Sequence, residues 1–435
     1  MIKKFQDIFS IPELKRRILF TIGLLIVYRI GGHITAPGVN PLALKAFFQN
    51  QKGTIFALYD LFAGGNLRRA TIFALGIMPY ISASIIIQLL QAVIPYFEKL
   101  AKEGEEGRKK ITQYTRYGTV LLAMVQSIGI SYFLLSMNPG GGSVVTMSPL
   151  AFRILTVITM TAGTIFIMWL GEQISERGIG NGISLIIMVG ILARYPGNFL
   201  NTWRAIKLGQ ITPFRMVFFA VIMVAVVAAV ILITQGQRRI PVQYAKRIVG
   251  NKVYGGRSQY IPLRVNTAGV IPIIFAQSIM MFPSTIAMFF KGSTIISGIQ
   301  AVLAPGSWLY ILLYAIIIVF FTYFYTAIIL NPTDMAENMK KYGGFIPGIR
   351  PGKRTSDYID RILTRVTLPG AIFLAFIAVL PDILMRRGGL PFYFGGTGLL
   401  IIVGVMLDTL KQVETHLLMR HYDGFMKKGH LRGRR

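Results

Sequence analysis

The chain of 435 residues contains no cysteine, and only 17 of its residues are acidic against 46 that are basic. Without cysteine, neither a disulfide nor a thiolate metal site nor a cysteine nucleophile is possible. Charged residues make up 14% of the chain, whereas soluble domains carry about 25%. A soluble protein of this length could not cover its surface with polar groups at so low a charge content. The composition therefore indicates an integral membrane protein.

Sequence signals of catalysis and cofactor binding are also missing. Segment 104–110 (GEEGRKK) lacks the spacing of a phosphate-binding loop and has an acidic interior. The glycine-rich segment 178–182 follows no strand, which argues against a dinucleotide site. The four histidines lack metal-ligand spacing, and no Gly-x-Ser-x-Gly sequence occurs. We therefore expect no enzyme, no cofactor and no metal, so that a partner has to supply any energy for transport.

Apolar windows free of charge indicate the number of membrane-spanning helices, because about 20 residues span the hydrocarbon core. Two windows exceed one helix: the run 138–142 (NPGGG) is predicted to end a helix in one, and a helix is predicted to begin near Trp308 in the other. Two short windows need flanking residues or a tilt. The windows are 18–44 (interrupted only by Arg29), 70–97, 117–152, 154–171, 178–193, 216–237, 265–290, 292–333, 366–381 and 388–407. The pattern predicts an all-α membrane protein with ten transmembrane helices.

Lys and Arg concentrate in alternate connections between these windows, which identifies the cytoplasmic side. The basic segments are 1–17, 98–117, 172–182, 237–264, 332–367 and the tail 411–435. Both termini are therefore predicted to be cytoplasmic. No small-residue cleavage site follows the first apolar stretch, so a cleavable signal peptide is not expected. The basic excess also suits anionic lipid headgroups or a partner that carries nucleic acid.

Segment 54–67 (TIFALYDLFAGGNL) does not fit a spanning helix. It is apolar but too short, Asp60 interrupts it, and a long helix is predicted to begin after it near Ala70. A re-entrant segment beside a pore is one interpretation, since irregular backbone at membrane depth needs protein or water around it. An interfacial amphipathic helix is the alternative.

Seven segments, in this order, resemble the SecY family, the central subunits of protein-conducting channels. They are 75–86 (LGIMPYISASII), 171–174 (GEQI), 176–184 (ERGIGNGIS), 236–240 (GQRRI), 266–272 (NTAGVIP), 345–352 (FIPGIRPG) and 391–397 (PFYFGGT). The resemblance is to the bacterial type and extends from residue 11 to the tail. It implies two five-helix halves, here 18–195 and 196–410, related by an inverted pseudo-twofold around an hourglass pore.

The resemblance implies a constriction ring and a plug. A ring of branched aliphatic side chains offers an ion no ligand and gates by dewetting. For any single isoleucine, contact with lipid or a neighbouring helix is the alternative. The implied ring is Ile77, Ile81, Ile187, Ile274 and Ile401. The implied plug is segment 54–67, with Thr54, Phe56, Asp60 and Phe62, and with Gly64 and Gly65 as its hinge.

The resemblance also implies a lateral gate toward lipid and a cytoplasmic docking surface. The gate residues are Ser82, Gln88, Gln126, Asn266 and Gln277, for which ordinary bonding between helices is the alternative. The docking residues in loops 237–264 and 332–367 are Arg238, Arg239, Lys246, Arg247, Lys252, Arg257 and Arg350. For the docking residues, topology alone is the alternative. The implied partners are SecE-like and SecG-like membrane subunits, the SecA motor, the ribosome, signal peptides with nascent chains, and anionic lipids.

Two functions of different classes fit a polytopic membrane protein: a passive channel for polypeptides, and a secondary transporter or flippase. A coupled transporter needs titratable groups at the midplane of the membrane. The carboxylates nearest the bilayer are predicted at or near helix ends; they are Asp60, Glu172, Asp382 and Asp408. The sequence therefore favours a channel. The resemblance implies that this channel lies in the cytoplasmic membrane and that SecA or the translating ribosome drives it.

Overall fold

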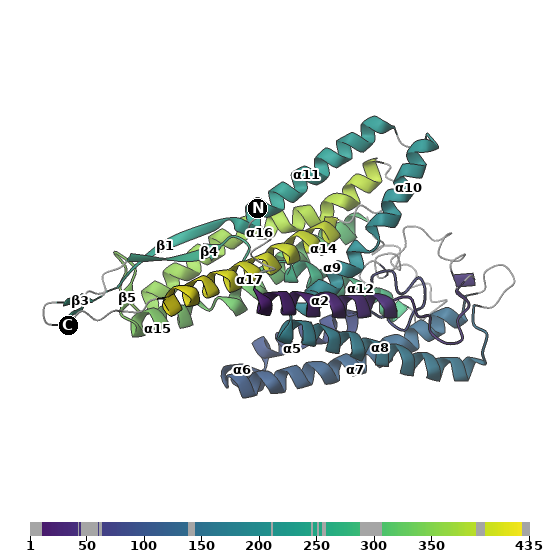
Figure 1. Cartoon of the computed structure of the whole chain (residues 1–435), viewed down its shortest axis with the longest axis horizontal. Helices are drawn as coiled ribbons and strands as arrows, with labels where there is room; N and C mark the ends of the chain where they lie inside the picture. Colours follow the sequence, from purple (N-terminus) through teal and green to yellow (C-terminus); the bar gives the residue numbers. More distant parts are fainter. Residues whose placement is uncertain are drawn as a thin grey trace. The chain divides into compact units, whose positions relative to one another are not determined.

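A computed structural model describes residues 11–41, 43, 44, 60, 63–137, 144–209, 212–244, 247–249, 252–254, 258–287, 307–388 and 396–428. Helices dominate this part of the chain (Figure 1). Each of the ten predicted windows holds one helix: α2 (Pro12–Gly31), α5 (Met78–Val93), α7 (Glu105–Leu135), α8 (Pro149–Arg177), α9 (Gly182–Leu192), α11 (Pro213–Gln235), α12 (Ile271–Ala287), α14 (Trp308–Ile329), α16 (Lys353–Gly388) and α17 (Gly396–Lys428). The helical class of the membrane part is confirmed.

Length and composition suit most of these helices to a membrane. Among the described residues, six stretches are long and apolar enough to span one: Glu105–Leu135, Pro149–Arg177, Gly182–Lys207, Phe214–Gln235, Trp308–Lys341 and Lys353–Leu380. A seventh arises if α5 and α6 (Pro95–Lys102), which are bent by 98° at Ile94, count as one span. The stretch that starts with α9 includes α10 (Tyr195–Lys207), so the short window at 178–193 gains its length from the residues that follow it.

Helix termini follow from local residue chemistry. The Asn181 side chain accepts a hydrogen bond from the Ser184 backbone N–H at 3.1 Å and caps α9. The Ser307 hydroxyl caps α14 by accepting from the Tyr310 N–H at 3.1 Å. Such caps satisfy backbone donors that the first helical turn leaves open. The predicted start of a helix near Trp308 is confirmed, and α7 ends at residue 135, just before the NPGGG run.

The predicted helix start near Ala70 is wrong, because residues 63–77 form a series of turns and α5 begins at Met78. Ala70 has φ of 42° and Gly76 has φ of 58°, and positive φ is incompatible with a right-handed helix. The apolar pattern continues through this segment, so hydrophobicity alone did not reveal the break.

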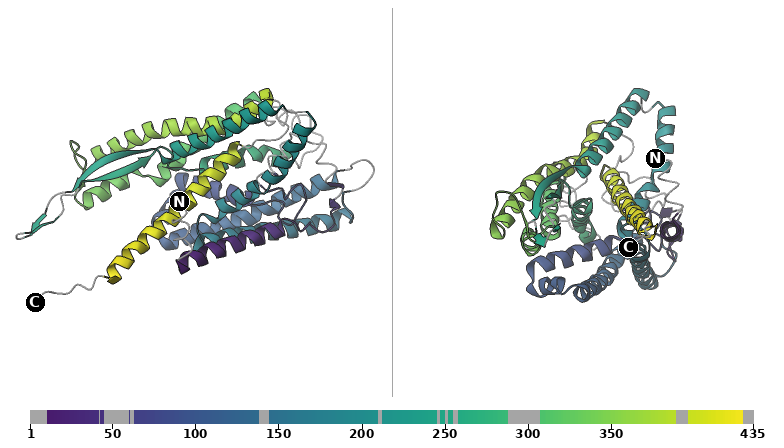
Figure 2. Two further views of the ribbon diagram at one scale, coloured as in Figure 1. Left: turned by 45° about the horizontal axis from the view of Figure 1, so that its top comes forward. Right: turned by 60° about the vertical axis from the view of Figure 1, so that its left-hand side comes forward.

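The chain divides into two compact units, which we describe separately. The first consists of Met1–Trp203, Ser278–Pro305 and Val405–Arg435. In it, α7 lies along α8 and against α5 (Figures 1 and 2). Small residues bring the backbones together: a Cβ added to Gly163 on α8 would lie 2.0 Å from the Ile72 carbonyl oxygen. The turns before α5 therefore pack directly on the α8 backbone.

The second unit consists of Arg204–Gln277 and Gly306–Gly404. Loop 237–264, which the all-α prediction left without strands, contains β1 (Gln237–Tyr244), β2 (Arg247–Val249), β3 (Lys252–Tyr254) and β4 (Ser258–Arg264). Strand β1 pairs antiparallel with β4, with Ile240 opposite Ile261, and also with β5 (Gly344–Phe345). The inner face of this sheet packs on α15 (Pro332–Lys341) and on the start of α16 (Figure 2). This packing buries Ile240, Val242, Leu263, Met339, Ile359, Ile362 and Leu363.

We expect Gly163→Ala to destabilise the protein by about 1–3 kcal/mol, because the new methyl group would collide with the Ile72 carbonyl in an already filled contact. The measurement is the Tm of the detergent-solubilised protein. Gly23→Ala on α2 is the matched control, since a Cβ at Gly23 meets nothing within 4 Å. Equal Tm values for the two variants would show that the turns do not press on α8.

Candidate functional site

A buried carboxylate lies in the segment predicted to be a plug. Asp60 is 2% exposed, and its Oδ1 accepts a hydrogen bond from the Arg68 backbone N–H at 2.9 Å. Its Oδ2 lies 3.6 Å from Nη1 of Arg194, which follows α9. Burying a charge is unfavourable unless it is paired and hydrogen-bonded. The Asp60 carboxylate meets both conditions.

Gly64 and Gly65 have φ of 70° and 84°, a region that favours glycine. At Gly64 a Cβ would also lie 2.9 Å from the Gly190 Cα on α9, so two glycines meet here backbone to backbone. At Gly65 a Cβ would meet nothing within 4 Å. The hinge role of these glycines stays a prediction. Thr54, Phe56 and Phe62 lie outside the described residues.

All five isoleucines predicted to form a ring are buried. In the first unit, the Ile81 N–H donates to the Ile77 carbonyl at 3.1 Å at the start of α5, and Ile187 lies on α9. In the second unit, Ile274 lies on α12 and Ile401 on α17. The joint arrangement of the five isoleucines stays a prediction.

The polar residues predicted for a lateral gate lie in the helical core. Ser82 and Gln126 are buried on α5 and α7, which pack together, while Gln88 Nε2 donates to Ser84 Oγ at 3.1 Å. In the second unit, Asn266 Nδ2 donates to the Gly269 carbonyl at 3.2 Å, and Gln277 is buried. Among the described residues, Gln88 Oε1, Asn266 Oδ1 and Gln277 Nε2 are buried without a hydrogen-bond partner. A buried polar atom without a hydrogen-bond partner costs free energy, and a water molecule or a polar chain that bonds to it removes this cost.

The predicted docking residues of loop 237–264 do not share one face. Arg238 and Arg239 are neighbours on β1, so their side chains point to opposite sides of the strand. Arg239 stands opposite Pro262 on β4 and is exposed. Arg247 and Lys252 begin β2 and β3, which pair with each other. Lys246 and Arg257 lie outside the described residues.

Arg350 lies in a turn between β5 and α16. Gly348 and Gly352 on either side have φ of 82° and 105°. The Thr355 hydroxyl donates to the Arg350 carbonyl at 2.9 Å, which fixes the backbone. The side chain is exposed, and within the described part of the chain its guanidinium has no partner. The turn thus holds a free cation in a defined place.

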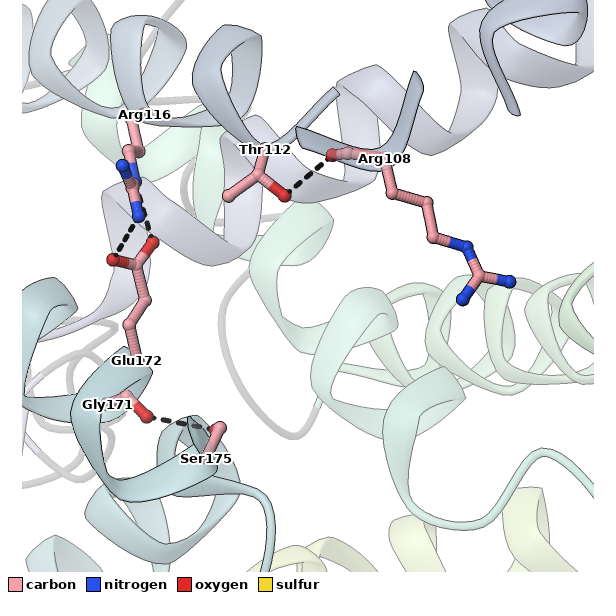
Figure 3. A network of polar contacts seen from close by, with 6 residues as sticks. All are labelled: Arg108, Thr112, Arg116, Gly171, Glu172 and Ser175. Carbon is pink, nitrogen blue, oxygen red and sulfur yellow. Dashed lines mark hydrogen bonds and ion pairs between the residues drawn. The ribbon is translucent and has the colours of Figure 1, made fainter. Parts of the chain in front are cut away.

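A polar network joins α7 to α8 near the end of α8 (Figure 3). Arg116 donates from Nε and Nη2 to the two carboxylate oxygens of Glu172, at 2.9 and 2.8 Å. The hydroxyls of Thr112 and Ser175 instead bond to carbonyls one turn back in their own helices. The bidentate pair therefore provides the polar contact between the two helices in this network.

In the neighbouring α6, a hydrogen bond from Lys102 lowers the pKa of the exposed Glu98 carboxyl below its usual value.

No three metal-ligating side chains converge within the described ranges.

Comparison with known proteins settles the family. The sequence profile of the SecY family matches residues 71–410. The protein translocase subunit SecY of Escherichia coli K12 is 50% identical over 427 residues, covering 98% of this chain and 96% of the relative. That of Aquifex aeolicus is 45% identical, covering 98% of this chain and all of the relative. The chain belongs to the SecY family.

Solved structures agree on the SecY fold. A protein conducting channel aligns with a TM-score of 0.64 at 20% identity, covering 92% of each chain. Sec61 in the canine ribosome–channel complex aligns with a TM-score of 0.59 at 18% identity, again covering 92% of each. The fold is therefore that of the ten-helix SecY and Sec61 channels. SecY proteins are channel subunits, so this chain is a component of a translocase and not an enzyme.

Sequence reasoning missed three arginines that make polar contacts between elements of the first unit. Arg194 pairs with Asp60, Arg29 Nη1 donates to the Gly64 carbonyl at 3.4 Å, and Arg116 holds Glu172. Two of them carried a signal: Arg29 is the single charge in the first apolar window, and Arg194 directly follows the window at 178–193. A charge that interrupts or ends an apolar window indicates a buried partner.

Glu172→Gln should lower stability by about 1 kcal/mol, because it breaks a bidentate pair whose arginine is half exposed. The expected Tm decrease should shrink at high salt, which screens the wild-type pair. Glu98→Gln, which breaks the fully exposed pair with Lys102, is the control and should leave Tm unchanged. Equal effects of the two substitutions would contradict a special role for the α7–α8 pair.

Proposed function

We propose that this chain is the pore-forming subunit of a protein translocase. It passes unfolded polypeptides across the membrane and releases apolar helices sideways into lipid. Family membership and the channel fold support the channel function. The observation that carries the pore assignment is the burial of five isoleucines, which lie directly before α5 and on α5, α9, α12 and α17. An aliphatic constriction offers a passing polypeptide no specific hydrogen bond, so chains of any sequence can slide through.

The chain is a multi-pass membrane protein. We infer that it lies in the cytoplasmic membrane with both termini in the cytoplasm. Both termini belong to the basic set of segments, and Lys and Arg concentrate on the cytoplasmic side. The proposed halves 18–195 and 196–410 surround the pore, and segment 54–67 closes its outer funnel. Of a SecY relative it is known that the plug domain stabilises the closed state and maintains a membrane seal.

Energy comes from partners in this proposal. Loops 237–264 and 332–367 hold seven Lys and Arg each, and they dock either the SecA motor or the ribosome. One relative, Sec61, is found in a complex with a ribosome. The rigid sheet of β1, β4 and β5 supports these loops on α15 and α16. SecE-like and SecG-like subunits stabilise the helices from outside, signal peptides enter between the gate residues, and anionic lipids bind the basic margin.

Replacing Ile77 or Ile81 by Asn should raise the ion leak of the resting channel severalfold, because polar side chains allow water to wet the constriction. The measurement is conductance in planar bilayers of the protein with its membrane partners. Ile86→Asn, at an exposed position of the same helix, is the control and should leave the leak unchanged. Correctly inserted Ile77 and Ile81 variants with wild-type leak would contradict the ring.

Arg350→Glu should reduce translocation about tenfold, the effect of losing one strong contact at an interface. A guanidinium fork on a held backbone suits bidentate binding of phosphate or carboxylate, so Arg350→Lys should give an intermediate loss. The measurement is import of a secretory protein into proteoliposomes with the motor. Lys109→Glu makes the same charge change at an exposed position outside the two docking loops and should have little effect. If Arg350→Glu instead lowered Tm, the residue would be structural and not a docking contact.

A further inference from the structure

Two arginines from different elements contact Asp60 and Gly64. Arg194, just after α9, faces the Asp60 carboxylate at 3.6 Å. Arg29, in the last turn of α2, donates to the Gly64 carbonyl at 3.4 Å. The Asp60 carbonyl itself accepts from the Gly65 N–H at 2.8 Å, which joins Asp60 to the turn at 63–65. This turn is thus attached to two neighbouring helices through one carboxylate and one carbonyl.

One face of α9 forms the seat of this turn. Ile187, Gly190 and Arg194 follow one another at spacings of three and four residues, which places them on the same side of a helix. The helical geometry continues through Ala193, so Arg194 stays in register with the face. Gly190 provides the space in which Gly64 approaches. Seven residues of helix rise about 10 Å, so Arg194 lies about two turns from Ile187, the proposed constriction residue on α9.

The ion pair is the polar part of this seat. Asp60 is 2% exposed, and the Arg194 side chain is 24% exposed. At 3.6 Å the pair acts by charge and not by a hydrogen bond, and within the described residues Arg194 Nη1 has no hydrogen-bond partner. Removing one member of a buried pair leaves the other charge unpaired, which is strongly destabilising. When the turn leaves its seat, water has to solvate both charges.

We propose that Arg194 is the positioning residue of the plug: its ion pair with Asp60, together with the Gly64–Gly190 contact, holds the turn on α9 and keeps the resting channel closed. This inference rests on the proposed function. Opening then requires a signal peptide or a partner to supply the free energy that separates Asp60 from Arg194. The strength of this pair sets the fraction of channels that are open at rest.

The test uses the full chain with its membrane partner subunits in planar bilayers. The resting KCl current is measured per inserted channel. A second readout is labelling of the Ala63→Cys variant by a membrane-impermeant maleimide. Ala63 is 0% exposed beside the turn, and the chain has no native cysteine that would react. Asp60→Asn and Arg194→Gln should each raise the resting current about tenfold and make the introduced thiol accessible to the maleimide.

The double variant Asp60→Asn/Arg194→Gln should raise the resting current no more than either single variant, because the two residues act as one pair and the double variant leaves no unpaired buried charge. Arg194→Lys keeps the charge, so most channels should stay closed and the resting current should stay near that of the wild type. Arg69→Gln is the matched control: it removes the charge of a neighbouring exposed arginine that makes no bond to Asp60 within the described part of the chain. It should behave as wild type.

Wild-type current and labelling in both single variants would overturn the proposed role of the Asp60–Arg194 pair, provided that the Ile77 and Ile81 variants leak. Additive effects in the double variant would overturn it too, since they would make the residues independent. If a signal peptide triggers no current in the wild type and the isoleucine variants do not leak, the proposed channel function is wrong, and the proposed role of the Asp60–Arg194 pair is wrong with it. Should Arg194→Gln fail to insert, Asp60→Asn and Arg194→Lys still decide between these outcomes.

Discussion

A backbone that leaves the helix inside an apolar bundle must still find partners for its N–H and C=O groups, and the first unit is organised around that constraint. Residues 63–77 are not helical, yet many of their backbone groups are bonded. The Ala36 N–H donates to the Ala70 carbonyl at 2.8 Å, and the Ile72 N–H donates to the Ile34 carbonyl at 3.0 Å. Residues 34–36, which follow α2, thus pair antiparallel with residues 70–72 and supply hydrogen bonds that a helix would have made internally. A non-helical element therefore sits among rigid helices at little polar cost.

Small residues decide how closely these parts approach. Gly163 lets the backbone before α5 rest on α8, and Gly190 lets Gly64 rest on α9. In a membrane, helices gain little from hydrophobic association, and close backbone contact with a few polar bonds takes its place. The contacts differ in kind. The Arg116–Glu172 fork joins two long helices through two hydrogen bonds, whereas the Asp60–Arg194 pair ties a turn to a helix by charge alone.

The second unit meets a different requirement, since its proposed docking loops lie in water and have to hold a partner firmly. A sheet in water needs an apolar face on one side, and Ile240, Val242 and Leu263 provide it against α15 and α16. The Gly-rich turn then places Arg350 beyond that stiff platform. Positive charge alone follows from topology, but a cation on a backbone held in one place requires the packed sheet beneath it.

The sequence by itself determined the membrane class, the ten helical windows and the family. These depend on composition, on apolar length and on local motifs, which a linear chain displays directly. It also predicted the helix limits at the NPGGG run and at Trp308, where Gly, Pro and a capping Ser act on their immediate neighbours. Only the tertiary structure decided the break before Met78, because long-range bonds from 34–36 hold those turns. The pairing of Asp60 with Arg194 was likewise hidden, since the two residues lie far apart in the chain and a charge does not name its partner.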